Sequence, residues 1–97
     1  MKMQDIIKRN LKIRYEILRT LYEYDAQNKS FSSEDFSKEK NYSEDEVLKA
    51  LKFLKEEYLV DYETVLSGDF IRLGLLSEGS KIVEKVEQVK NADTSEE

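Results

Sequence analysis

Apolar residues recur at helical spacing along most of the chain, most clearly in its middle third. Four of them follow one another at intervals of four, three and four residues and so share one face of a helix: Val47, Leu51, Leu54 and Tyr58. Ser43 stands where an N-cap is expected, and Glu46, three residues later, completes a capping box. Tyr42 precedes the cap and forms a hydrophobic staple with Val47. The pattern predicts a helix over residues 43–57.

A longer helix is predicted from Gln4 to about Ala26, because no Gly or Pro interrupts this stretch. Ile17, Leu18 and Leu21 form a compact apolar face that we expect to lie against the core. Further apolar residues continue toward the N-terminus, and we predict that they serve dimerisation: Ile6, Ile7, Leu11 and Ile13. Two interpretations stay open, because an amphipathic extension needs an apolar partner. It folds back over the last helix of its own chain, or it packs against a second copy.

A short helix is predicted between these two. Ser32 is its expected N-cap, and Phe31 and Phe36 occupy the two positions of a hydrophobic staple. The helix is expected to end at about Glu39, followed by the turn 40–42. Two helices joined by so few residues indicate a helix-turn-helix arrangement.

The spacing changes from helical to alternating after Tyr58. β-branched and aromatic residues dominate residues 60–65 and 70–73, and the turn residues 67–69 separate the two runs, so a β-hairpin is predicted. Ser77 is then expected to cap a last helix. The apolar face of this helix comprises four residues: Ile82, Val83, Val86 and Val89. We expect one domain over residues 1–90 and a disordered acidic tail over residues 91–97.

Composition narrows the class of function. The chain has 97 residues, of which 39% are hydrophobic, which suffices for one small domain. It contains no Cys and no His, so it lacks thiolate ligands, disulfides and the commonest acid-base group near neutral pH. We therefore expect neither an enzyme nor a metal or cofactor site. The absence of a long apolar run predicts a cytoplasmic protein without a membrane segment.

The charge is unevenly distributed. The net charge is −5, although residues 1–24 carry six basic and three acidic side chains. The acidic remainder argues against indiscriminate binding to phosphates, because nucleic-acid-binding domains usually carry a basic excess. Any basic surface is expected on the first helix.

The order helix, helix, helix, hairpin, helix resembles that of bacterial and archaeal winged helix-turn-helix regulators. The third helix reads Ser-x-x-x-Val-x-x-x-Leu-x-x-Leu from Ser43, and residues 76–79, Leu-Ser-Glu-Gly, are a shifted form of the Leu-Thr-x-x-Gly step of that superfamily. Residues 14–18 resemble the first helix of its small single-domain members, among them the YjcQ-type proteins of unknown function. The resemblance covers about residues 11–90. It implies a mainly α winged-helix fold and a homodimeric DNA-binding transcriptional regulator, although this scaffold hosts many unrelated functions.

Two features depart from that superfamily. Its members often place Gly at the end of the third helix, where this chain has Glu56, Glu57 and Tyr58, so either a non-glycine residue bears a cost of about 1 kcal/mol or the helix runs directly into the strand. The hairpin also carries a single basic residue, Arg72, together with Asp69. It is poorly suited to a DNA minor groove.

A helical wheel predicts which residues of the third helix face outward, where a winged helix presents its DNA-reading side chains: Asp45, Lys49, Lys52, Phe53 and Glu56. The four charged ones form two expected pairs, Asp45 with Lys49 and Lys52 with Glu56. The expected contacts to double-stranded DNA are basic residues on the two central helices and the hairpin: Lys38, Lys40, Lys49, Lys52 and Arg72. Phe53 stands alone among charges and is a candidate contact to a protein partner. The alternative function is therefore a protein-interaction module with an acidic surface.

Overall fold

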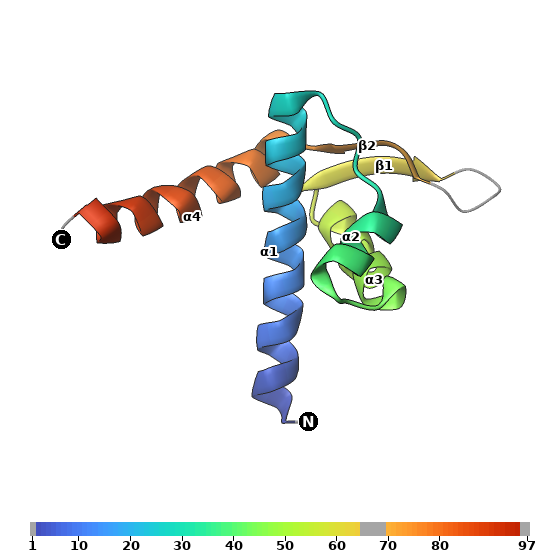
Figure 1. The fold of residues 1–97 in the computed structure, drawn as a ribbon, viewed down its shortest axis with the longest axis horizontal. Helices are drawn as coiled ribbons and strands as arrows, with labels where there is room; N and C mark the ends of the chain where they lie inside the picture. The colour runs from blue at the N-terminus through green and yellow to red at the C-terminus, as the bar shows by residue number, and fades with distance from the viewer. Residues whose placement is uncertain (1, 65–69, 96–97) are drawn as a thin grey trace.

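The computed structural model describes residues 2–64 and 70–95, with the side chains of residues 70–72 and 92–95 excluded. Within these residues the chain is mainly helical, with one small antiparallel hairpin, and the layout is compatible with that of a winged helix (Figure 1). The elements are, in order, α1 (Met3–Gln27), α2 (Ser33–Lys40), α3 (Glu44–Glu56), β1 (Val60–Thr64), β2 (Phe70–Leu75) and α4 (Ser77–Ser95).

The core forms where α1 meets the other elements. The predicted inner face of α1 is confirmed, since Ile17, Leu18 and Leu21 are buried. Ile13 is also buried, at 1% exposure, so its assignment to a dimer interface is wrong. It lies in the core of its own chain because α3 packs against α1 at this level. The remaining core residues come from α2, α3, β1 and α4: Phe36, Val47, Ala50, Leu51, Leu54, Val60 and Val83.

Each of the first three helices closes on a residue in the left-handed conformation. Asn28, Asn41 and Tyr58 have φ values of 56°, 60° and 60°. After α3, the Tyr58 N–H donates to the carbonyl of Lys55 and the Leu59 N–H to that of Leu54, which is the hydrogen-bond pattern of a Schellman motif. The chain therefore turns sharply between α3 and β1, with a non-glycine residue in the strained position.

This turn overturns one prediction. The apolar spacing puts Tyr58 on the buried face of the third helix, but the helix ends at Glu56 and the Tyr58 side chain is 77% exposed. The apolar position next to the core is taken instead by Val60, which is 1% exposed. The other three residues of the predicted face, Val47, Leu51 and Leu54, are buried as expected.

The hairpin is antiparallel, and its register is interrupted once. Val60 pairs with Leu75 and Asp61 with Gly74, but Glu63 pairs with Ile71. Tyr62 alone therefore faces two residues of β2, the arrangement of a β-bulge. The predicted alternation holds in β1 as far as Glu63, since Val60 is buried and Tyr62 half-buried while Asp61 and Glu63 are exposed, but Thr64 is exposed as well. The predicted turn over residues 67–69 lies outside the described residues.

The start of α4 is fixed by the backbone. The Leu76 N–H donates to the Leu59 carbonyl at 3.0 Å, and the Leu76 carbonyl accepts from Ser80, which makes Leu76 the residue before the first helical turn. Ser77 is thus the first helical residue, and its prediction as the cap is wrong. Gly79 is buried against Leu59, where a Cβ would overlap the carbonyl oxygen. At the other end, α4 continues to Ser95, past residue 90, where the sequence predicts a disordered tail.

Two helices project from this arrangement (Figure 1). In that view α2, α3 and the hairpin lie on one side of α1, and α4 leaves on the other. The N-terminal part of α1 extends beyond α3, and the C-terminal part of α4 extends away from the core. The longest dimension, 51 Å, is twice the shortest, 25 Å. The alternative in which the α1 extension folds back over α4 is therefore not the one observed.

Candidate functional site

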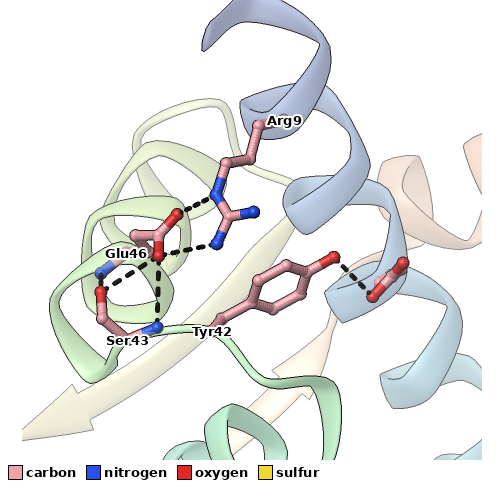
Figure 2. A network of polar contacts seen from close by, with 5 residues as sticks. Arg9, Tyr42, Ser43 and Glu46 are labelled. Carbon is pink, nitrogen blue, oxygen red and sulfur yellow. Dashed lines mark hydrogen bonds and ion pairs between the residues drawn. The ribbon is translucent and has the colours of Figure 1, made fainter. Parts of the chain in front are cut away.

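A network of hydrogen bonds and an ion pair surrounds the N-terminus of α3 (Figure 2). The Ser43 hydroxyl accepts from the Glu46 N–H at 3.1 Å, and the Glu46 carboxylate accepts from the Ser43 N–H at 3.2 Å. These two bonds satisfy backbone donors that the helix leaves unpaired. The predicted capping box is confirmed, and it fixes where the exposed face of α3 begins.

Two residues of α1, Arg9 and Glu16, contact the residues around this cap. Arg9 places Nε 2.6 Å from one Glu46 oxygen and Nη2 3.1 Å from the other, across 37 residues of sequence (Figure 2). Its guanidinium also lies 5.1 Å from the ring centre of Tyr42, whose hydroxyl donates to Glu16 at 3.1 Å. The Arg9 bonds, followed by that from the Ser43 backbone, lower the pKa of the Glu46 carboxyl to about 2. Glu46 therefore stays ionised at any physiological pH.

The outer face of α3 is as predicted. Asp45, Lys49, Lys52 and Glu56 are all exposed and lie opposite the buried residues. Lys49 pairs with Asp45 at 3.0 Å, as the spacing of four residues predicts. The pair predicted between Lys52 and Glu56 is not formed among the described residues, so the Lys52 ammonium is open to a ligand. An exposed pair of this kind is weak, and a phosphate can compete for Lys49 as well.

The other predicted DNA contacts are less accessible. Lys38 binds Glu34 at 3.0 Å within α2, and this hydrogen bond raises the pKa of its ammonium group. Lys40, at the end of α2, is exposed. The side chain of Arg72 lies outside the described residues. Lys49 and Lys52 thus share one face of α3, and Lys38 and Lys40 belong to α2, on the far side of the turn.

Lys55 carries a role that the sequence pattern does not predict. Its ammonium donates to the Tyr62 carbonyl at 2.6 Å, lies 4.0 Å from the Asp61 carboxylate and sits 4.5 Å from the Tyr62 ring centre. These contacts fasten the hairpin to the last turn of α3. Lys55 falls on the flank of the α3 wheel and seven residues before Tyr62, but only the turn at Tyr58 brings the two together.

Phe53 has a partner within its own chain. It is 36% exposed, and the Arg14 guanidinium lies over its ring at 3.6 Å from the centre. This cation–π contact explains an aromatic residue at the edge of a charged helix face, because α1 shields one side of it. Asn10, Arg14, Asp45 and Lys49 line a small cleft of about 320 Å³ between α1 and α3.

A second cleft, of about 480 Å³, lies between α1 and α4 and includes Arg19, Val83 and Glu84. Tyr22 donates to Glu84 at 2.8 Å, and Tyr15 donates to Glu87 at 2.7 Å. Burial, and then the bond to Glu87, raises the pKa of Tyr15 to about 12. These phenols are neutral donors that join the two helices, and their high pKa disfavours a role as bases.

Neither cleft contains a recognisable catalytic or metal-binding set. Among residues 2–64 and 70–95, no three acidic residues are placed to hold a metal ion. No helix in the same residues is long and apolar enough to cross a membrane.

Comparison with known proteins gave no match. No protein-family model matches the chain, and no curated protein or solved structure was found to be similar to it. The exposed face of α3, where Lys49 and Lys52 lie three residues apart, is the candidate site that the geometry favours.

Proposed function

We propose that the protein is a winged-helix DNA-binding regulator that presents α3 to the major groove. The observation that carries this proposal is the outer face of α3, where Lys49 and Lys52 stand exposed, three residues apart, opposite the buried Leu51. A helix of this kind, preceded by a short helix and a tight turn, is the element that helix-turn-helix proteins insert into DNA.

The position of the hairpin supports the same proposal. Lys55 holds β1 beside the end of α3, so a wing would lie next to the groove that α3 occupies. Lys38, Lys40 and Arg72 are the further candidates for phosphate contacts. Phosphate contacts position a protein on the duplex, and contacts to base edges specify the sequence.

The charge of α3 limits the affinity. The first turn carries Glu44, Asp45 and Glu46, and the last of these is bound to Arg9. These carboxylates stabilise the helix dipole but repel phosphates. DNA binding is therefore expected to be weak and to depend on few ion pairs. The logarithm of the affinity should fall with the logarithm of salt concentration at a slope of about −0.9 per neutralised phosphate.

Charge reversal of the outer face tests the proposal. The double variant Lys49→Glu, Lys52→Glu leaves every buried residue of α3 in place, and it should abolish duplex binding at low salt. The matched control is Lys81→Glu, Lys85→Glu, which makes the same change in net charge on exposed positions of α4. We expect the control to retain most of the binding and the salt slope of the parent. Equal binding by parent and α3 variant, or no binding by the parent, would contradict the proposal.

A protein partner is the second candidate. Lys49 pairs with Asp45 and Lys38 with Glu34, so the charges of these two lysines are neutralised. The remaining charged side chains around α3 include more carboxylates than ammonium groups. Phe53 offers the uncovered part of its ring beside them. A basic partner would fit this surface. If the parent protein is folded but does not bind duplex DNA at low salt, that result would favour the protein-interaction function.

A further inference from the structure

The projecting part of α1 (Figure 1) carries an exposed apolar stripe. Its members lie within an arc of about 140° on one side of the helix. They are between 39% and 68% exposed, and we call them the extension stripe: Met3, Ile6, Ile7 and Leu11. The next apolar residue of α1, Ile13, is buried at 1% exposure. Since the core ends between Leu11 and Ile13, the stripe is available to a partner.

The extension stripe lies beside α3. Ile6 precedes Ile13 by seven residues, close to two helical turns, so both point to the same side of α1. Ile13 lines the cleft between α1 and α3 together with Glu46 and Ala50, and Arg9 binds Glu46. The first turn of α3 therefore stands next to the inner end of the stripe. A flat lipid surface would meet α3 before it covered the stripe, whereas a single helix can lie alongside it.

Basic side chains border the stripe on both sides. Lys2 stands four residues before Ile6, whose N–H donates to the Lys2 carbonyl at 3.2 Å, and Lys8 stands three residues before Leu11. Side chains at these spacings are neighbours on the surface of a helix. Both lysines are exposed, and neither forms an ion pair with another residue that the structure describes. Asp5, the only acidic residue of the extension, lies on the opposite side of the helix. The border of the stripe is therefore cationic.

A second copy of this chain matches these charges poorly. If two extension stripes faced each other across a twofold axis, the bordering lysines of both copies would come together and repel. The exposed apolar residues Ile82 and Val89 of α4 offer no opposite charge either, because residues 77–91 carry three acidic and three basic side chains. The charges therefore favour a different occupant from the second copy that the sequence predicts.

We propose that the extension stripe binds an amphipathic helix of another protein whose apolar face is bordered by carboxylates. The apolar side chains of the two helices interdigitate over about two and a half turns, and Lys2 and Lys8 pair with carboxylates along the edges. A contact of this length buries less than the roughly 800 Å² per partner of a stable interface, so the complex is expected to form and dissociate rapidly. The bonds between Arg9 and Glu46 fix the direction of the extension. The proposal does not depend on DNA binding.

Titration of the full chain with a synthetic helix tests the charge preference. The probe is a peptide of about three heptads with Leu at the a and d positions and Glu at e and g, and the control peptide has Lys in place of Glu. Amide NMR spectra should show that the acidic peptide shifts the signals of residues 3–12, with an affinity at least roughly tenfold higher than that of the basic peptide. The net charge of the chain, −5, would by itself favour the basic peptide, so this result would locate the preference at the stripe. No shift of residues 3–12 with the acidic peptide, or equal affinities for both peptides, would overturn the proposal.

Substitutions identify the surface that binds the acidic peptide. Ile7→Asp, Leu11→Asp should weaken binding at least roughly tenfold, because it places carboxylates in the apolar contact. Ile82→Asp, Val89→Asp makes the same change at exposed positions of α4 and should bind the peptide as the parent does. All four residues are exposed in the single chain, so circular dichroism should show an unchanged fold. Equal binding by the two double variants would refute the assignment to the stripe.

Reversal of the border charges tests the lysines without any change to the apolar residues. Lys2→Glu, Lys8→Glu should invert the preference, so that the basic peptide binds at residues 3–12 more tightly than the acidic one. An unchanged preference would contradict the pairing of these lysines with carboxylates.

Two further measurements distinguish the other occupants. Binding of the parent to phosphatidylglycerol vesicles that is lost in Ile7→Asp, Leu11→Asp, without binding to the acidic peptide, would assign the stripe to an anionic lipid surface. Sedimentation of the parent at twice the chain mass, reduced to the chain mass in the same variant, would assign the stripe to a second copy. Either result would overturn the proposal. Since neither readout involves DNA, this failure is distinguishable from that of the α3 proposal.

Discussion

The Arg9 guanidinium holds both carboxylate oxygens of Glu46, at 2.6 and 3.1 Å, and so ties the projecting part of α1 to the first turn of α3. Glu46 also caps its own helix through Ser43. One carboxylate therefore serves the start of α3 and its attachment to α1. Because the charged carboxylate of Glu46 takes part in both interactions, its ionisation should change the free energy of unfolding.

The first prediction concerns acid pH. The pKa of Glu46 is about 2 in the folded protein, below its ordinary value of 4.5, so its stabilising contribution is complete above pH 4.5 and is lost as the pH falls toward 2. Glu46→Gln keeps a capping-box side chain but loses the charge. Chemical denaturation should show a stability gap between parent and variant that is constant above about pH 5 and closes in this window. A gap that does not change with pH would assign the effect to something other than ionisation.

The second prediction concerns the buried face of α3. Leu51→Ala should cost about 2–5 kcal/mol of unfolding free energy, because it removes a fully buried side chain from the core. Leu48→Ala is the matched control on the same helix, since Leu48 is 43% exposed, and it should cost no more than about 0.5 kcal/mol. Equal losses at the two positions would mean that the helix is rotated.

The third prediction separates the two candidate caps. Ser43→Ala should cost about 1 kcal/mol, because the Glu46 N–H loses its acceptor. Ser77→Ala should change stability by no more than about 0.5 kcal/mol, because Ser77 lies inside α4 and Leu76 precedes the helix. Thermal or urea unfolding of the two variants measures the contrast. A loss of about 1 kcal/mol on Ser77→Ala would show that Ser77 does cap α4.

The fourth prediction concerns the strained end of α3. Tyr58→Gly should stabilise the protein by about 1 kcal/mol, because glycine adopts the left-handed conformation without the steric cost of a Cβ. Little packing is lost, since the tyrosine side chain is largely exposed. Asn41→Gly, at a position where asparagine already tolerates φ 60°, is the control and should gain less. Denaturant midpoints compare the two, and a loss on Tyr58→Gly would show that its ring packs against the protein.

The fifth prediction contrasts two glycines. Gly79→Ala should destabilise the protein by about 1–3 kcal/mol, because the new methyl group would overlap the Leu59 carbonyl oxygen and lie 2.7 Å from a Leu75 methyl. Gly74→Ala should be within about 0.5 kcal/mol of the parent, since no atom lies within 4 Å of the position that its new methyl group would take. Similar unfolding curves for the two variants would rule out the close approach of α4 to Leu59.

The sequence predicted the elements that local patterns determine. The start of α3 was predictable because Ser43 and Glu46 meet over three residues, and the inner face of α1 because Leu18 and Leu21 repeat at helical spacing. The outward placement of Lys49 and Lys52 followed from the same periodicity. In each case the interaction that decides the structure lies within one or two turns of helix.

The predictions that were wrong concern positions where contacts between residues far apart in the sequence determine the structure. Tyr58 continues the apolar periodicity of α3, but the chain leaves the helix so that Val60 can enter the core. Ile13 belongs to the same apolar stripe as Ile6, and only the position of α3 determines how far along α1 the core extends. Ser77 looks like a cap, but the hydrogen bond from Leu76 to Leu59 sets the start of α4. Arg9 and Glu46 are 37 residues apart, and no local pattern predicts their contact.

The uninterrupted course of α1 restricts how its length can change in evolution. From Met3 to Gln27 the helix has no break, so the projecting stripe and the core-facing residues keep a fixed angular phase. One inserted residue between Leu11 and Ile13 would turn the stripe by about 100°, away from its former direction. An insertion of about seven residues would restore the phase to within about 20°. Related chains should therefore differ in this region by lengths that keep this phase, such as about seven or eleven residues, and an insertion of one or two residues would place the stripe on a different side of the molecule.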